Sequence, residues 1–109
     1  FSNLGFNTGN AIILEESFSS LDQLVEVLNA DSSFQLHIVG HTDDVGKELD
    51  NQMLSQNRAQ AVANFLIERG IAEERLKIEA FGETQPLVPN DSPENRAMNR
   101  RVELTIFFE

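Results

Sequence analysis

Apolar residues recur with a helical spacing in two long segments of the chain. From residue 18 to residue 28 they stand three or four positions apart, which is typical of one face of an amphipathic helix. A similar spacing begins near Met53 and ends at the sequence ERGI. There Gly70 is expected to adopt the left-handed conformation after the helix, with Ile71 packing back on Leu66 in a Schellman motif. The two segments predict two long helices.

A strict alternation of apolar and polar residues marks other segments. In the clearest of them, Phe34, Leu36 and Ile38 share one face, so this face is expected to be buried. Similar alternations, with a thinner apolar pattern near the N-terminus, predict strands in NLGFNT, SFQLHIVGH, RLKIEAFGE and VELTIFF. The polar stretch with three prolines before the last strand is expected to connect the elements.

The order β-α-β-α-β-β predicts an α/β (α+β) two-layer sandwich. Two long helices are expected on one face of a mixed four-stranded sheet, with the other face partly solvated. The length of 109 residues fits a single domain spanning 1–109. Because the chain begins without methionine and shows no signal-peptide pattern, we expect it to be part of a longer protein whose export signal or tether has been removed.

Composition narrows the classes of partner. Eight Lys and Arg against 18 Asp and Glu give a net charge of −10, which argues against binding to nucleic acid or anionic lipid. No apolar stretch approaches the roughly 18 residues of a membrane span, so direct membrane insertion is not expected. The absence of cysteine excludes disulfides, thiolate zinc sites and thiol nucleophiles. Arginines gather in short stretches, which suits a local anion site, although surface ion pairs are the alternative.

The stretch GHTDDVGKELDNQMLSQNRA, residues 40 to 59, concentrates the polar chemistry of the chain. A metal site there would use His41, Asp43 and Asp44, near His37, but neither the HExxH spacing nor a calcium-loop pattern is present, so no metal or other cofactor is expected. An enzyme would need Ser55 as a nucleophile with His41 as its base. Since Ser55 lies inside the expected helix without a G-x-S-x-G elbow, we expect a helix-capping or back-bonding serine and no catalytic residue.

A site for a zwitterion fits this stretch better. Asp43 follows a strand, Asn51 lies near the start of the next helix, and Arg58 lies one to two turns inside it, so the three can converge. Asp43 would accept from an ammonium group, while Arg58 would offer a bidentate fork to a carboxylate. The alternative is a plain Asp43–Arg58 salt bridge that ties the loop to the helix.

Several sequence blocks carry a resemblance to a known family. GHTD-x-x-G, N-x-x-LS-x-x-RA, G-x-x-x-P and NRRVE occur in that order, and FNTGNAIILEESFSSLDQLVEVL looks like an opening strand and first helix. Over nearly its whole length the chain resembles the OmpA-like C-terminal domain, the peptidoglycan-binding module of OmpA-type porins, peptidoglycan-associated lipoproteins and flagellar stator proteins.

This resemblance implies noncovalent binding of the peptidoglycan stem peptide at meso-diaminopimelate, whose free end carries an ammonium and a carboxylate. In similar proteins an aspartate and an arginine grip that end, which implies these roles for Asp43 and Arg58. The remaining residues that the resemblance places in the site are Asn51, Arg100, Thr42, Leu54, Phe6 and Asn7. Alanine in place of Asp43 or Arg58 is expected to abolish binding and leave the fold intact.

The chain departs from the family at Asn7, where many members have an aspartate after the phenylalanine, and this questions the contact by Phe6 and Asn7. His41 is expected to be a hydrogen-bonding residue at the strand end, and Arg101 a structural ion-pair partner. The resemblance implies a nonenzymatic anchor on the periplasmic side of the outer membrane of a Gram-negative bacterium, joined to a parent outer-membrane or lipoprotein segment. The alternative is an OmpA-like protein-interaction or oligomerisation domain without wall binding.

Overall fold

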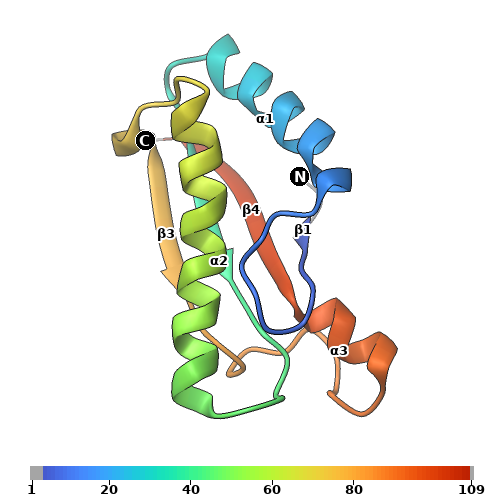
Figure 1. Cartoon of the computed structure of the whole chain (residues 1–109). Coiled ribbons are helices and arrows are strands. Elements are labelled where there is room, and N and C mark those ends of the chain that lie inside the picture. Colours follow the sequence, from blue (N-terminus) through green and yellow to red (C-terminus); the bar gives the residue numbers. More distant parts are fainter. Residues whose placement is uncertain (1–3, 109) are drawn as a thin grey trace.

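The computed structural model describes residues 4–108 and consists of one sheet and its covering helices (Figure 1). The elements are β1 Leu4–Gly5, the 3-10 turn η1 Glu15–Ser17, α1 Phe18–Ala30, β2 Phe34–Gly40, α2 Glu48–Glu68, the 3-10 turn η2 Glu73–Arg75, β3 Leu76–Ala80, α3 Pro93–Asn99 and β4 Arg101–Phe108. The first expected strand is reduced to two residues in the described part, and its Asn3 lies outside it.

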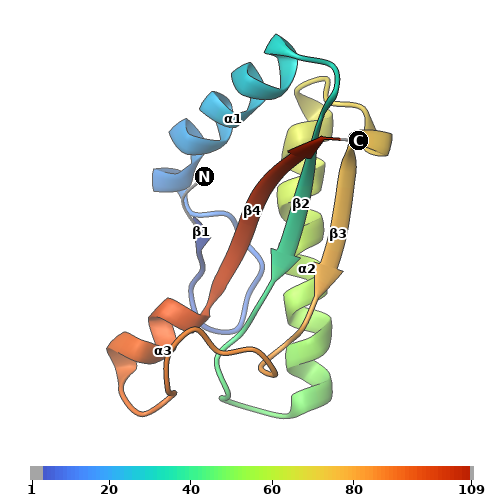
Figure 2. The ribbon, with the colours of Figure 1, turned by 180° about the vertical axis from the view of Figure 1, so that it is seen from behind.

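The four strands form a mixed sheet in the order β1-β4-β2-β3. β4 runs antiparallel to both β1 and β2, whereas β2 and β3 are parallel. α1 and α2 cover one face, and Figure 2 shows the face that these helices leave open. The predicted two-layer arrangement is therefore confirmed. Within residues 4–108, no helix has both the length and the apolar character needed to cross a membrane.

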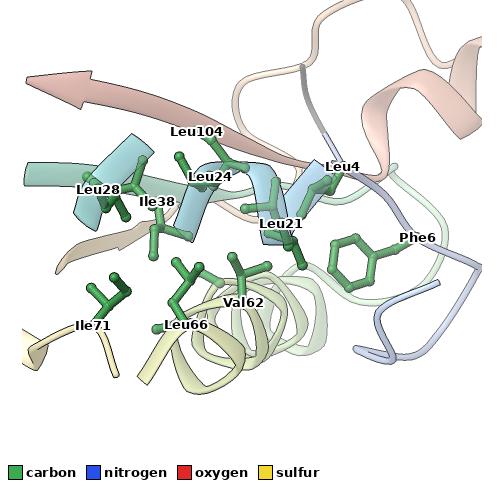
Figure 3. Packing of buried hydrophobic residues seen from close by; sticks show 14 residues of the cluster. Leu4, Phe6, Leu21, Leu24, Leu28, Ile38, Val62, Leu66, Ile71 and Leu104 are labelled. Atoms are coloured by element: carbon green, nitrogen blue, oxygen red, sulfur yellow. The ribbon is translucent and has the colours of Figure 1, made fainter. Parts of the chain in front are cut away.

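The core lies between the covered sheet face and the two long helices (Figure 3). The side chains that fill it include Leu21, Leu24 and Leu28 of α1, Val62 and Leu66 of α2, and Leu36, Ile38, Val102 and Leu104 of the sheet. Each buried aliphatic side chain of this kind stabilises the fold by about 1.5–3 kcal/mol. The alternating and helical patterns in the sequence predicted these inward-facing residues.

The C-terminal end of α2 has the predicted Schellman motif. Gly70 has a φ of +93°, a conformation that glycine adopts without a Cβ penalty. Its N–H donates to Ile67 O at 3.0 Å, and the N–H of Ile71 donates to Leu66 O at 3.1 Å. Ile71 is buried in the core next to Leu66, so the motif turns the chain back toward β3.

Helix α3 was not predicted, because its seven residues are too short to show a helical period. It begins with a cap: Ser92 Oγ accepts from the N–H of Asn95 at 3.1 Å, and Pro93 takes the first helical position. At its end the buried Asn99 accepts from the N–H groups of Leu87 and Val88. These bonds hold the proline-containing loop and fix the position of the next residue, Arg100.

The end of β2 lies unusually close to α2. A Cβ at Gly40 would stand 2.0 Å from the carbonyl oxygen of Ser55, so only glycine fits there. Ser55 Oγ donates to Gln52 O at 2.8 Å and accepts from the N–H of Gly82 at 2.9 Å. The predicted back-bonding role of Ser55 is confirmed, and the close approach brings the loop after β2 against the middle of α2.

Candidate functional site

A cluster of charged side chains lies where β2 ends against α2. Asp43 is 5% exposed, and its Oδ1 accepts from the N–H of Val45 at 3.1 Å. Its Oδ2 accepts from Arg100 Nη1 at 3.1 Å. Within residues 4–108 the ion-pair partner of Asp43 is therefore Arg100, and the alternative of a direct Asp43–Arg58 salt bridge is wrong.

Arg58 is fully buried in the same cluster and donates to three backbone carbonyl oxygens. Its Nε donates to Asn10 O at 3.0 Å, its Nη1 to His41 O at 3.1 Å and its Nη2 to Asn7 O at 2.8 Å. The Phe6 ring lies 5.2 Å from Arg58 Cζ, a cation–π distance. Residues 6–10 thus enclose the guanidinium.

The cluster carries an excess positive charge. Arg58 donates to neutral acceptors, while Asp43 and Arg100 balance one another, so these three side chains sum to +1 before the carboxylate of Glu83, which accepts from Asn51, is counted. Burial lowers the pKa of Arg58 to about 10; the carboxylate of Asp43 opposes this shift, and the charge of Arg100 adds to it. Arg58 therefore remains a cation at neutral pH, in a chain whose net charge is strongly negative.

Asn51 and Thr42 hold the loop that carries Asp43. The amide of Asn51 donates to Asp43 O at 3.3 Å, to Val45 O at 3.1 Å and to Glu83 Oε1 at 3.0 Å. Thr42 Oγ1 donates to Asp43 O at 2.8 Å. The sequence did not mark Glu83 as a site residue, because it stands at the end of the expected strand RLKIEAFGE and is an unspecified position of the G-x-x-x-P block. Thr42 is 2% exposed and Asn51 is 5% exposed, the same as Asp43, so all three are enclosed.

The other expected site residues contribute in different ways. Leu54 lines a groove of about 380 Å³ beside the loop, together with Asn51. Phe6 is buried in the core, and its carbonyl oxygen accepts from Arg100 Nε at 3.0 Å. Asn7 meets Arg58 through its backbone carbonyl, while the residue itself is exposed. Asn7 therefore reaches the cluster through its main chain, and Phe6 reaches it through both its carbonyl oxygen and its ring.

His41 and Arg101 share the carboxylate of Glu103. His41 Nε2 lies 3.1 Å from Glu103 Oε1, and Arg101 Nε donates to Glu103 Oε2 at 3.0 Å, so the structural roles expected for both residues are confirmed. Burial and the charge of Arg101 lower the pKa of His41, although Glu103 opposes them. Among residues 4–108, no three His, Asp or Glu side chains are grouped as metal ligands.

Comparison with known proteins identifies the family. The OmpA family model matches residues 5–100. The chain is 37% identical over 113 residues to the photosystem I P700 chlorophyll a apoprotein A2 of Gloeobacter violaceus, covering 98% of this chain and 13% of that protein. It is 33% identical over 103 residues to the peptidoglycan-binding protein ArfA of Mycobacterium tuberculosis, covering 94% and 32%.

A solved structure agrees with these relatives. The cell wall anchor of the T6SS from Pseudomonas aeruginosa superposes with a TM-score of 0.79 and 33% identity, over 95% of this chain and 75% of that one. The chain spans only 13% and 32% of the two curated relatives described above. The match of the family model to most of its length shows that this chain belongs to the OmpA family.

Proposed function

We propose that this domain binds peptidoglycan noncovalently, at the zwitterionic end of meso-diaminopimelate in the stem peptide. Two relatives support the general function, because one is a peptidoglycan-binding protein and the other a cell wall anchor. Membership of the OmpA family supports it as well. The proposed binding is an equilibrium, and no catalytic residue takes part in it.

The observation that carries this proposal is the charge pattern of the buried cluster. It holds a carboxylate, Asp43, close to a guanidinium, Arg58, whose charge meets only neutral acceptors. A zwitterion offers the complement of both groups: Asp43 would accept from the ammonium, and Arg58 would donate to the carboxylate. The excess charge of +1 favours the carboxylate, since Arg100 already balances Asp43.

Binding at Arg58 involves the segment that encloses it. The carbonyl oxygens of Asn7 and Asn10 accept hydrogen bonds from two of the guanidinium nitrogens. A ligand carboxylate would replace one or both of these carbonyl oxygens. Residues 7–10 would then move aside. The asparagine at position 7 is compatible with this role, because it meets Arg58 through its backbone rather than its side chain.

The remaining proposed contacts surround this pair. Asn51 and Thr42 would keep the Asp43 loop in place, and Arg100 would orient the carboxylate of Asp43. Leu54 would contact the aliphatic stem of diaminopimelate. Each charge-assisted hydrogen bond contributes about 1.5–3 kcal/mol, and association costs several kcal/mol, so the affinity of one domain is expected to be modest. Many wall sites and a tether would supply avidity.

We further propose that the domain anchors its parent protein in the cell envelope, on the periplasmic side of the outer membrane of a Gram-negative bacterium. The cell wall anchor and the peptidoglycan-binding relative support a place in the envelope. The sequence resemblance to OmpA-type porins and peptidoglycan-associated lipoproteins supports the outer-membrane or lipoprotein parent.

Calorimetric titration with a diaminopimelate stem peptide and with its lysine counterpart tests the proposal. The lysine peptide lacks the terminal carboxylate, so Arg58 would lose its new partner and binding should weaken at least tenfold. Asp43→Asn and Arg58→Lys should weaken binding of the first peptide, Asp43→Asn by about 10- to 100-fold. Asp22→Asn and Arg69→Lys, which alter a surface ion pair at 3.0 Å, are the matched controls and should bind normally. Absence of binding by the unaltered domain would favour the interaction-domain alternative.

A further inference from the structure

The groove beside the Asp43 loop continues away from the charged cluster. It is bounded by Val45, Gly46 and Lys47 of the loop, by the first turns of α2, and by Gly9 on the opposite side. Its volume is about 380 Å³, larger than the end of one diaminopimelate residue requires. Asn51 belongs both to this groove and to the hydrogen bonds that hold Asp43, so the groove lies next to the cluster.

Lys47 is the one basic side chain among residues 4–108 without a partner there. Each of the six arginines donates at least one hydrogen bond to the protein. The other lysine, Lys77, lies with its Nζ 5.8 Å from the centre of the Phe107 ring. Lys47 is exposed and makes no hydrogen bond, ion pair or ring contact with residues 4–108, although carboxylates are abundant in this chain. Its ammonium group is therefore available to a ligand in the groove.

The position of Lys47 is unfavourable for the helix that it precedes. It is the N-cap residue of α2, with φ −81° and ψ 142°, and its side chain makes no capping hydrogen bond. Serine, threonine, aspartate or asparagine would stabilise this position, whereas a cation is disfavoured by the positive end of the helix dipole. Local stability does not explain the lysine, and such exceptions are expected at functional positions.

We propose that Lys47 pairs with a second carboxylate of the stem peptide and so makes this domain prefer free over amidated peptides; this inference rests on the proposed function. Outside diaminopimelate, the stem peptide carries the α-carboxylate of its γ-linked glutamate and that of its terminal alanine. Among residues 4–108, Lys47 is the only cation that lines the groove. Asp50 lines it too and repels a carboxylate from its own side, which directs the carboxylate to Lys47.

Titration with matched tetrapeptides tests this inference. Three peptides share the same diaminopimelate residue: one has both carboxylates free, one has the glutamate amidated, and one has the terminal alanine amidated. For the unaltered domain, amidation of one of the two positions should weaken binding about three- to fivefold, as for an exposed ion pair. This difference should shrink in ~0.5 M salt because the pair is screened. The position at which amidation weakens binding identifies the carboxylate that pairs with Lys47.

Two lysine variants provide the comparison. Lys47→Gln should bind all three peptides equally well, at the affinity that the unaltered domain shows for the sensitive amidated peptide. Lys77→Gln removes the same charge from the uncovered sheet face and should keep the preference. Equal binding of the three peptides by the unaltered domain, or an unchanged preference in Lys47→Gln, would overturn the role of Lys47 while leaving diaminopimelate binding in place. Failure of the unaltered domain to bind any of the peptides would overturn the proposed function, and this inference with it.

Discussion

Two arginines at opposite ends of β2 make similar hydrogen bonds in different surroundings. Arg58 donates to the carbonyl oxygens of three residues after β1 and β2. Arg75, where η2 meets β3, donates through Nη2 to Leu28 O at 2.6 Å and to Asp31 O at 2.9 Å. Its Nε donates to Phe34 O at 3.0 Å. Each arginine therefore fastens irregular backbone to the sheet.

The two sites differ in burial and in charge. Arg58 is fully enclosed and shares its surroundings with a buried carboxylate and a second arginine, whereas Arg75 is only half-buried. The acid next to Arg75 is the exposed Asp31, whose pKa is lowered first by hydrogen bonds from Ser33 and to a smaller extent by Arg75. Hydrogen bonds alone thus do not separate a structural arginine from a binding arginine. The neighbouring charges distinguish the two sites, and experiments can test whether only Arg58 takes part in binding.

The largest effect is expected from alanine at the two arginines. Arg58→Ala should lower the free energy of unfolding by about 3 kcal/mol or more, because three carbonyl groups, one of them in a buried hydrogen bond, lose their donor and a cavity remains. Arg75→Ala should cost about 1–2 kcal/mol, since water can reach its acceptors. Urea unfolding measures both. The structure thus corrects the expectation that alanine at position 58 leaves the fold intact, and a smaller loss for Arg58→Ala than for Arg75→Ala would contradict this account.

Replacing Asp43 by asparagine, which removes the charge and keeps the shape, tests binding at the cluster that holds Arg58. Asp43→Asn should weaken binding of a diaminopimelate stem peptide about 10- to 100-fold, the equivalent of one charge-assisted hydrogen bond. Asp31→Asn makes the same change beside Arg75 and should bind as the unaltered domain does. Calorimetry provides the affinities, and the unfolding midpoint shows that each variant is folded. Equal affinities for the two variants would remove Asp43 from the site.

Peptide binding should disturb one arginine and not the other. If a ligand carboxylate replaces the acceptors of Arg58, the amide resonances of residues 6–10 should shift during an NMR titration. Those of residues 28–34, which are fastened by Arg75, should remain in place. Saturable shifts that leave residues 6–10 unaffected would mean that the ligand binds without displacing this segment.

The smallest expected effect is a pH dependence of the free energy of unfolding, which arises from His41 next to Arg58. His41 has a pKa below its usual 6.5, because burial and Arg101 disfavour the imidazolium. The unfolded chain therefore binds more protons, so stability is complete above pH 6.5 and falls as the pH decreases toward the lowered pKa of folded His41. Urea unfolding between pH 7.5 and about 5 measures this slope. His41→Phe should flatten it, and His37→Phe on the open sheet face should retain it.

The sequence predicted those parts of the fold that depend on repeated local patterns. Leu21, Leu24 and Leu28 recur at helical spacing, and each is buried as expected. Gly70 and Ile71 form the predicted turn, because their chemistry determines the geometry of a helix end. Helix α3 lacked such a period, although Ser92 followed by Pro93 was a usable sign of a helix start.

The candidate site was predictable in its residues but not in their pairing. Asp43 and Arg58 are close in sequence, and the resemblance to the family assigned a role to each. The actual partner of Asp43 is Arg100, 57 positions away, which only the tertiary fold brings near. The acceptors of Arg58 are backbone carbonyl groups, which have no residue-type signature. Patterns in one sequence reveal side-chain chemistry better than they reveal main-chain contacts.

The attachment of residues 4–10 has a mechanical consequence. Within residues 4–108, β1 pairs with β4 through Leu4 and Gly5, and the next contacts along the chain are those of Phe6 with Arg100 and of Asn7 with Arg58. A pulling force applied at the N-terminal end would load these contacts one after another, beginning with the β1–β4 pairing. Tension on the chain and a ligand in the site would then act on the same two guanidinium groups.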